Sequence, residues 1–335
     1  MARRRAAQRR PVGSRRIAVS AALPRAPRKP VVLVTAADLA PQALELLAGY
    51  EVVFAGKTPS EEDIVALCKM HDPAGIIVRY SNVGEAAMAA APSLRVISKH
   101  GSGTDTIDKD AAQARGIEVR AAAGANAAAV AEQAMALLLA CAKSVLQLDR
   151  RMRAGHWDKP THKSVELNGR TLGLVGLGAI GLRFARMAAA MDMRVIGYDP
   201  YAKNVPDFIE RVDLPALWRE ADAISLHCPL TAENSKLVNA RTLSSCKNGV
   251  ILVNTARGGL VDEEALLDAL RKRQVAAAGL DSFAVEPMTA GHPFQQEPNI
   301  VLSPHIGGVT SDAYVNMGVA AVRNARNVIE GAAKP

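Results

Sequence analysis

One stretch of the sequence constrains the fold more than any other: a glycine-rich turn between a strand pattern and a helix pattern. The apolar run "TLGLVG" (171–176) leads into Gly176, Gly178 and Gly181 of "GLGAIG". A helical pattern follows, and a second apolar run ends at Asp199, eighteen residues after the last of these glycines. A strand, a GxGxxG turn, a helix and a second strand that ends in an acid together predict a dinucleotide-binding α/β unit.

The spacing of this turn has a physical reason. The glycines allow a tight turn, a close approach of the pyrophosphate and close packing of the helix on the strand. The phosphates then meet the positive end of the helix. Asp199 would accept hydrogen bonds from the adenosine ribose and repel a 2′-phosphate, which favours NAD over NADP. The residues predicted to contact the cofactor here are Gly176, Gly178, Ala179, Ile180, Gly181 and Asp199.

Apolar runs that predict strands alternate with helical patterns from residue 31 onward. The first group of runs is 31–36, 51–56, 75–80 and 94–99. A long helical pattern covers 126–155, and six further runs follow at 171–176, 194–199, 223–228, 249–255, 277–282 and 299–304. A last helical pattern covers 311–331. This β-α-β alternation predicts mostly parallel sheets.

The length of the chain, 335 residues, exceeds what one compact core usually holds and suggests two domains. We predict an α/β fold with two doubly wound parallel-sheet domains. One is a Rossmann domain for NAD at 128–306, and the other is a flavodoxin-like substrate domain built from 31–127 and 307–335. Residues 1–30 are predicted to form a disordered basic leader.

All the net basicity of the chain lies in its first 29 residues, which hold nine Arg, one Lys and no acid. Removing these ten from the 41 basic residues leaves 31 against 33 acids, so the remainder is near −2. The leader is a transit peptide, a basic arm for nucleic acid or an unstructured extension, and we favour the last. No apolar segment follows the arginines, so no secretory signal is expected. For the remainder we expect no nucleic-acid partner.

Cysteine usage and apolar run length indicate the compartment. The four cysteines are scattered and form no CxxC pair, which predicts neither a disulfide framework nor a metal site. The longest strongly apolar run, 134–142, is too short to span a bilayer, so no membrane association is expected. We expect a cytoplasmic protein with a reduced set of thiols.

Polar side chains stand at the predicted carboxyl ends of the strands, where ligands bind in sheets of this kind. After the glycine turn and Asp199 come His227, Thr255, Arg257, Asp281, Glu286 and His305. Three of these, Arg257, Glu286 and His305, are predicted to converge at one edge. An Arg offers a two-pronged donor to a carboxylate, and a His exchanges protons near neutral pH. A neighbouring Glu would favour the imidazolium form, so with a nicotinamide nearby the set suits hydride and proton transfer on a 2-oxo or 2-hydroxy acid.

At this point the sequence resembles the D-isomer-specific 2-hydroxyacid dehydrogenases. The matching segments are "GLVGLGAIG", "YDP", "LHCPLT", "NTARGGLVDEEAL", "GLDSFAVEP" and "SPHIGG", with "IIVRYS", "ISKHGSGTDTIDKDAA" and "GANAAAVAE" nearer the N-terminus. The resemblance covers nearly everything after residue 30. It implies an NAD-dependent enzyme whose active cleft lies between two domains and which is usually a homodimer.

The resemblance also implies roles for individual residues. The catalytic set is Arg257 as the substrate-binding cation, Glu286 as the tuning carboxylate and His305 as the acid and base. The substrate-binding set adds Arg79 and the backbone of Ser102 and Gly103. The cofactor-binding set gains His227, Pro229, Thr255, Ala256, Asp281, Gly307 and Gly308, of which Asp281 and the Thr255 region would hold the nicotinamide carboxamide.

The substrate is the least determined part of this interpretation. The sequence is similar to the phosphoglycerate dehydrogenase-like and the hydroxypyruvate or glyoxylate reductase-like members. Several residues add bulk or positive charge near the substrate tail. They are Tyr80, which follows Arg79, and Lys99 and His100, which precede the substrate loop. A phosphate, a sulfonate or a second carboxylate would suit them. An NAD-sensing corepressor of the same fold is the alternative, because such proteins retain the Arg, Glu and His.

Overall fold

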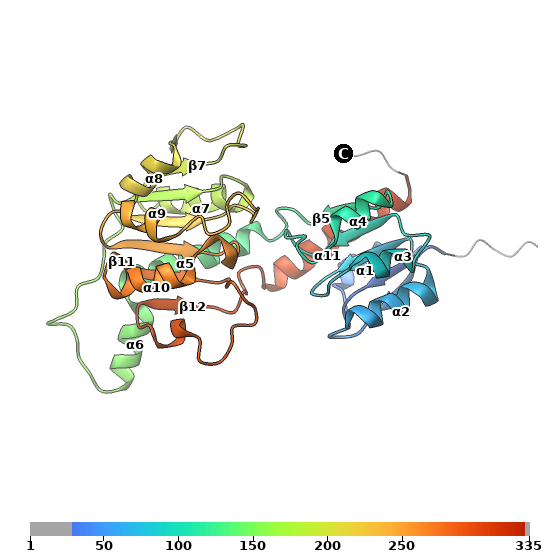
Figure 1. Cartoon of the computed structure of the whole chain (residues 1–335), viewed down its shortest axis with the longest axis horizontal. Helices are drawn as coiled ribbons and strands as arrows, with labels where there is room; N and C mark the ends of the chain where they lie inside the picture. The colour runs from blue at the N-terminus through green and yellow to red at the C-terminus, as the bar shows by residue number, and fades with distance from the viewer. Residues whose placement is uncertain (1–28, 332–335) are drawn as a thin grey trace, which may run out of the picture.

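The computed structural model describes residues 29–331. The predicted leader, apart from its last residues, lies outside this range. The described chain forms two sheets, and every strand pair in both is parallel. Figure 1 shows them as two separate lobes, with the chain crossing between them.

The first sheet has the strand order β2-β1-β3-β4-β5, which is the flavodoxin-like doubly wound order. Its strands are β1 (Val31–Val34), β2 (Glu51–Phe54), β3 (Gly75–Val78), β4 (Val96–Lys99) and β5 (Glu118–Ala121). Its helices are α1 (Pro41–Glu45), α2 (Glu61–His71), α3 (Glu85–Ala89) and α4 (Lys109–Ala114). All four residues of β3 are buried, as expected for a central strand covered on both faces.

The second sheet has the order β12-β11-β10-β9-β6-β7-β8, which contains the Rossmann order 3-2-1-4-5-6 around β6. Its strands are β6 (Thr171–Val175), β7 (Arg194–Tyr198), β8 (Ile209–Arg211), β9 (Ala223–Leu226), β10 (Val250–Asn254), β11 (Val275–Leu280) and β12 (Ile300–Leu302). The helices are α7 (Ala179–Ala189), α8 (Leu214–Glu220), α9 (Ala240–Ser245) and α10 (Glu263–Arg271), with short 3₁₀ turns at Gly258–Leu260 and Pro293–Gln296. The predicted fold class is confirmed.

Three helices link or cover the two sheets. Helix α5 (Ala127–Lys143) packs against α7, β10 and β11 of the second sheet. Helix α11 (Ser311–Ile329) returns to the first sheet, where it contacts β3, β4 and β5 (Figure 1). Helix α6 (Val145–Arg153) follows α5 and has no buried residue. This crossing over and back brings the carboxyl edges of the two sheets to one cleft.

Two features differ from the sequence prediction. The helix predicted over 126–155 is broken at Ser144, which adopts a left-handed backbone with φ of 52° and separates α5 from α6. Strands β5 and β8 were not predicted, because both are edge strands with charged residues that interrupt any apolar run. Within residues 29–331 no single helix has the length and apolar character to cross a membrane, although α5 and α6 together, bent by 59°, do.

Candidate active site

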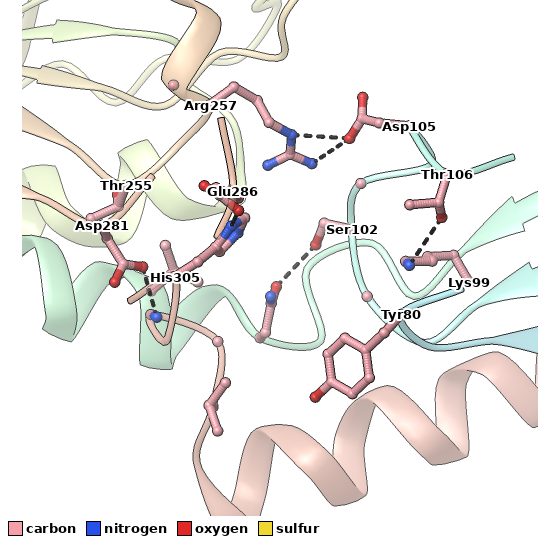
Figure 2. A pocket seen from close by; sticks show the side chains of 18 of the residues that line it. Tyr80, Lys99, Ser102, Asp105, Thr106, Thr255, Arg257, Asp281, Glu286 and His305 are labelled. Carbon is pink, nitrogen blue, oxygen red and sulfur yellow. Dashed lines mark hydrogen bonds and ion pairs between the residues drawn. The ribbon is translucent and has the colours of Figure 1, made fainter. Parts of the chain in front are cut away.

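The predicted catalytic and substrate-binding residues line one cleft of about 810 Å³ between the two sheets. One wall comes from the ends of β3 and β4 and includes Arg79, Lys99 and the loop 101–106. The opposite wall comes from the segments after β10, β11 and β12, which carry Arg257, Glu286 and His305. Figure 2 shows side chains from both walls directed into the same space. We call them the first-sheet wall and the second-sheet wall.

His305 and Glu286 form a direct pair on the second-sheet wall. The distance from His305 Nδ1 to Glu286 Oε2 is 2.7 Å, and the other carboxylate oxygen of Glu286 accepts the backbone N–H of Phe283 at 2.9 Å. Pairing through Nδ1 leaves Nε2 as the ring nitrogen that a ligand can reach. The imidazole is 47% exposed, so it is open to the cleft.

Asp281 holds the loop that carries His305. It is buried, with 2% of its surface exposed. Its Oδ1 accepts from Ser303 Oγ at 2.6 Å and from the Ile306 N–H at 3.0 Å, and its Oδ2 accepts from the Gly307 N–H at 2.8 Å. His305 itself has a φ of 54°, a left-handed backbone that costs free energy for a non-glycine residue. The bonds to Asp281 fix this turn, so the position of the imidazole depends on a carboxylate that bonds to the main chain.

Arg257 reaches across the cleft from the second-sheet wall. Its Nε and Nη2 donate to Asp105 Oδ2 at 2.9 and 2.8 Å, and its Nη1 donates to the carbonyl of Ala256 at 2.8 Å (Figure 2). Burial acts to raise the pKa of Asp105, but the charge and hydrogen bonds of Arg257 outweigh it and hold that pKa below its usual value. A carboxylate therefore already lies on the guanidinium. The sequence prediction missed Asp105, although it lies inside the quoted segment "GSGTDTID".

The first-sheet wall holds the remaining predicted substrate-binding residues. Ser102 Oγ donates to Asn126 Oδ1 at 2.9 Å, and a Cβ at Gly103 would come within 1.7 Å of Arg257 Nη2. Only glycine therefore lets the guanidinium lie against this loop. Lys99 donates to the carbonyl of Arg79 and, at 3.3 Å, to Thr106 Oγ1. Burial lowers the pKa of Lys99 to about 8; Asp105 opposes the shift and Arg257 adds to it.

Arg79 is fixed on three sides. Its Nη1 donates to Asp38 Oδ1 at 2.6 Å. Its guanidinium carbon lies 5.2 Å from the centre of the Tyr80 ring and 5.0 Å from that of Tyr314, so it makes a cation–π contact with each ring. Only 15% of the side chain is exposed. Burial and the charge of Arg79 lower the pKa of His100 to about 4, so this neighbour is neutral near pH 7.

The glycine-rich turn after β6 fits a bound dinucleotide. Gly176 has a φ of 100°, and a Cβ on it would lie 2.7 Å from the backbone of His227. A Cβ at Gly181 would lie 2.2 Å from the Gly176 carbonyl oxygen, so the helix packs close to the strand only with glycine there. Gly178 is the N-cap of α7, makes no side-chain cap and faces open space. The first N–H groups of α7 are therefore free to meet a pyrophosphate.

The acid after β7 stands next to this turn. Asp199 Oδ2 accepts the backbone N–H of Leu177 at 2.9 Å, and its Oδ1 accepts those of Tyr201 and Ala202. The carboxylate is thereby fixed at the carboxyl end of the strand, where a ribose would arrive. Thr255 has a buried Oγ1 without a hydrogen-bond partner at the other end of the cleft, and a carboxamide would supply one.

The other predicted cofactor residues divide into two groups. Ile180, Gly307 and Gly308 line the cleft. His227 instead turns its ring toward Phe184, with ring centres 5.4 Å apart, and its Nε2 lies 2.9 Å from Ser225 Oγ. Burial lowers the pKa of His227 to about 3, so it is neutral and supports the glycine turn from behind. Pro229 and Ala256 are not among the cleft-lining residues. In residues 29–331 no cluster of three or more His, Cys, Asp or Glu is arranged to hold a metal ion.

Comparisons with known proteins agree with this geometry. Residues 135–307 match the family model described as D-isomer specific 2-hydroxyacid dehydrogenase, NAD binding domain. The chain is 43% identical over 235 residues to the hydroxypyruvate reductase of Thermotoga maritima, covering 70% of this chain and 77% of that protein. It is 41% identical over 260 residues to the D-3-phosphoglycerate dehydrogenase of Mycobacterium leprae, covering 76% of this chain and 49% of that protein. The chain thus spans about half the length of this phosphoglycerate dehydrogenase relative.

Solved structures give the same result. The TT0316 protein of Thermus thermophilus superposes with a TM-score of 0.82 at 37% identity, covering 90% of this chain and 97% of that one. The match extends over both sheets, so it includes the cleft between them as well as the glycine turn. The chain therefore belongs to the D-isomer-specific 2-hydroxyacid dehydrogenases, oxidoreductases that use NAD as their cofactor.

Proposed function

We propose that the protein interconverts a small D-2-hydroxy acid and its 2-oxo acid, with His305 as acid and base. The observation that carries the proposal is the 2.7 Å pair of His305 and Glu286 in the same cleft as Arg257. A proton donor and a carboxylate-binding cation at one site suit reduction of a carbonyl that stands next to a carboxylate.

The roles of the side chains follow from their contacts. NADH, when bound, supplies the hydride. His305 donates its Nε2 proton to the carbonyl oxygen, since Nδ1 is held by Glu286. Glu286 holds Nδ1 and thereby fixes the orientation of the imidazole ring. Arg257 binds the substrate carboxylate, which takes the place of Asp105 on the guanidinium.

The loop after β4 completes the carboxylate site in this proposal. Ser102 and Gly103 line the cleft beside Arg257, so their backbone N–H groups can bind the second oxygen of the same carboxylate. The substrate tail then faces Arg79 and Tyr80 on the first-sheet wall. Phosphoglycerate dehydrogenase and hydroxypyruvate or glyoxylate reductase activities both fit a three-carbon or two-carbon acid in this orientation.

We also propose the domain limits predicted from the sequence, with residues 31–127 and 307–335 forming the substrate domain and 128–306 the NAD domain. The packing of α5 on β10 and β11, and that of α11 on β3 to β5, supports these limits.

A homodimer is proposed as the working form of the enzyme. Helix α6 and the segment after it project from the second lobe (Figure 1). They expose Val145, Leu146, Met152 and Trp157, and Trp157 is 70% exposed. A second copy of the chain would cover this apolar surface.

We further propose that the protein is cytoplasmic. All four cysteines lie within the described residues and are free thiols. Burial raises the pKa of each of them to about 11 or 12. Cys68, Cys141 and Cys246 are buried and Cys228 is partly buried, so none is an activated thiolate, which is consistent with a reducing compartment.

The test of the proposed function is a turnover assay with purified protein, NADH or NADPH, and a panel of 2-oxo acids that includes glyoxylate, hydroxypyruvate, phosphohydroxypyruvate and pyruvate. We expect oxidation of NADH with at least one member and a clear preference for NADH. Tight NAD binding without turnover of any panel member would contradict the proposal and favour the corepressor-like alternative.

A further inference from the structure

The guanidinium of Arg79 is paired before any substrate binds. Asp38, in the segment between β1 and α1, accepts from Arg79 Nη1 at 2.6 Å. The same oxygen of Asp38 accepts from the hydroxyl of Tyr314 on α11 at 2.9 Å. Asp38 does not line the cleft, whereas Arg79, Tyr80 and Tyr314 do. The carboxylate therefore lies behind the arginine and offsets its charge from the side away from the substrate.

The rest of the first-sheet wall carries one further cation and one neutral imidazole. Its second cation, Lys99, donates to the Arg79 carbonyl and to Thr106, and Asp105 lies in the loop beside it. His100 is buried and neutral near pH 7. Arg79 is thus paired with Asp38, whereas Lys99 donates only to neutral oxygens and Asp105 is paired with Arg257. Because Asp38 offsets the charge of Arg79, this arginine attracts a second anionic group on a substrate less than a free guanidinium would.

We propose that Asp38 sets the substrate class: by pairing with Arg79 it makes the enzyme select a 2-oxo acid with an uncharged tail over one with a phosphorylated tail. The inference rests on the proposed function, because it assumes that the substrate carboxylate binds Arg257 and that the tail faces Arg79. It narrows the choice that the sequence left open. Hydroxypyruvate or glyoxylate is the substrate of this site, and phosphohydroxypyruvate is disfavoured.

The aromatic rings explain why Arg79 does not simply turn toward a phosphate. Tyr80 and Tyr314 lie at 5.2 and 5.0 Å from its guanidinium carbon, and its Nε is buried without a partner. A side chain held between two rings and one carboxylate has few other rotamers available. A phosphate would have to compete with Asp38 for the same cation, at the additional cost of repulsion by that carboxylate.

The test compares two substrates in one preparation. For the wild type and Asp38→Asn, kcat/KM is measured with hydroxypyruvate and with phosphohydroxypyruvate, using NADH. Asn keeps an oxygen that can accept from Arg79 and Tyr314 but removes the charge. We expect the kcat/KM for phosphohydroxypyruvate to rise by about two- to fivefold relative to that for hydroxypyruvate, the size expected for an ion pair whose carboxylate is largely exposed. Because the ratio is internal, a fraction of unfolded enzyme does not change it.

Two further variants make the result specific. Asp268→Asn removes the acid of another exposed ion pair, that with Lys272 at 2.6 Å on α10, and should leave the ratio unchanged. The double variant Asp38→Asn with Arg79→Gln should lose the gain of the single variant, because the gain requires the freed cation.

The inference is overturned if the ratio stays constant or falls in Asp38→Asn, if the gain survives loss of Arg79, or if the wild type already favours phosphohydroxypyruvate. Turnover of hydroxypyruvate in all these cases would leave the proposed function intact. If the wild type turns over no member of the 2-oxo acid panel, the proposed function fails. Calorimetry on the same variants then measures the dissociation constants of D-glycerate and D-3-phosphoglycerate. The ratio of these two constants decides the inference about Asp38.

Discussion

The two walls of the cleft hold their functional side chains by different means. On the second-sheet wall Glu286 and Asp281 accept backbone N–H groups and thereby fix the segment around His305. On the first-sheet wall the guanidinium of Arg79 is held by the side chain of Asp38 and by two aromatic rings. A carboxylate that accepts main-chain N–H groups fixes a whole loop, whereas a carboxylate that pairs with one side chain sets the charge and position of that side chain alone. The chemistry is accordingly expected to be fixed and the substrate preference adjustable.

The largest effect is expected from removing the imidazole. His305→Ala should lower kcat by about 10²–10⁴, the usual contribution of general acid–base catalysis, with NAD affinity little changed. His305→Asn is the matched control for the backbone, since Asn tolerates the left-handed φ of 54°. Both variants should lose activity equally in steady-state assays. If His305→Asn kept near-normal turnover, the histidine would be a turn residue without a chemical role.

The next effect concerns the arginine that reaches from one wall to the other. Arg257→Gln should raise KM for the 2-oxo acid, with a loss in kcat/KM of about 10²-fold, as expected when one partner of a close charge pair is removed. Asp105→Asn keeps the guanidinium and is the control. It should lower KM or leave it unchanged, because in the proposed complex the substrate displaces Asp105 from the guanidinium. An equal rise of KM in both variants would show that Asp105, and not the arginine alone, is required.

A smaller loss is expected when the main-chain support of the second-sheet wall is weakened. Asp281→Asn keeps one acceptor oxygen but cannot accept from Ser303, Ile306 and Gly307 with two charged oxygens. We expect kcat to fall by about 10- to 10²-fold, in line with the cost of misplacing a reacting group. KM should change little, because Arg257 is untouched. A rise of KM at constant kcat would contradict the assignment of Asp281 to the His305 loop.

Cofactor choice offers a test away from both walls. Asp199→Ser should narrow the preference for NADH over NADPH by about tenfold or more in kcat/KM, because a carboxylate facing a 2′-phosphate is the repulsive element. The carboxylate also accepts three backbone N–H groups, so thermal stability is measured alongside. A wild type that already prefers NADPH would refute the assignment of Asp199.

How far the sequence predicts this molecule depends on the sequence distance between interacting residues. Buried strands such as β3 are apolar runs and could be recognised, whereas the edge strands β5 and β8 contain charged residues and could not. The rule that ligands lie at the carboxyl ends of strands identified the second-sheet wall. The partners Asp38 and Asp105 were missed because they are 41 and 152 residues from the arginines that they bind. No local pattern marks such a pair.

The smallest expected effect is a pH dependence of KM that comes from the first-sheet wall alone. Burial lowers the pKa of Lys99 to about 8, so the ammonium is charged below that pH and neutral above it. Between pH 7 and pH 9 the first-sheet wall therefore loses one positive charge. We expect the wild-type KM for hydroxypyruvate to rise by about two- to fivefold over this interval, the size of one charge acting through a partly solvated cleft.

In Lys99→Met the KM should already be raised at pH 7 and should not change further up to pH 9. Lys272→Met removes an exposed lysine at the C-terminal end of α10 and should keep the wild-type slope. His305 lies on the other wall and is assigned to the chemical step, so its contribution is measured in kcat and that of Lys99 in KM. An identical KM slope in Lys99→Met would place the titrating group elsewhere and would leave the first-sheet wall without a pH-dependent cation.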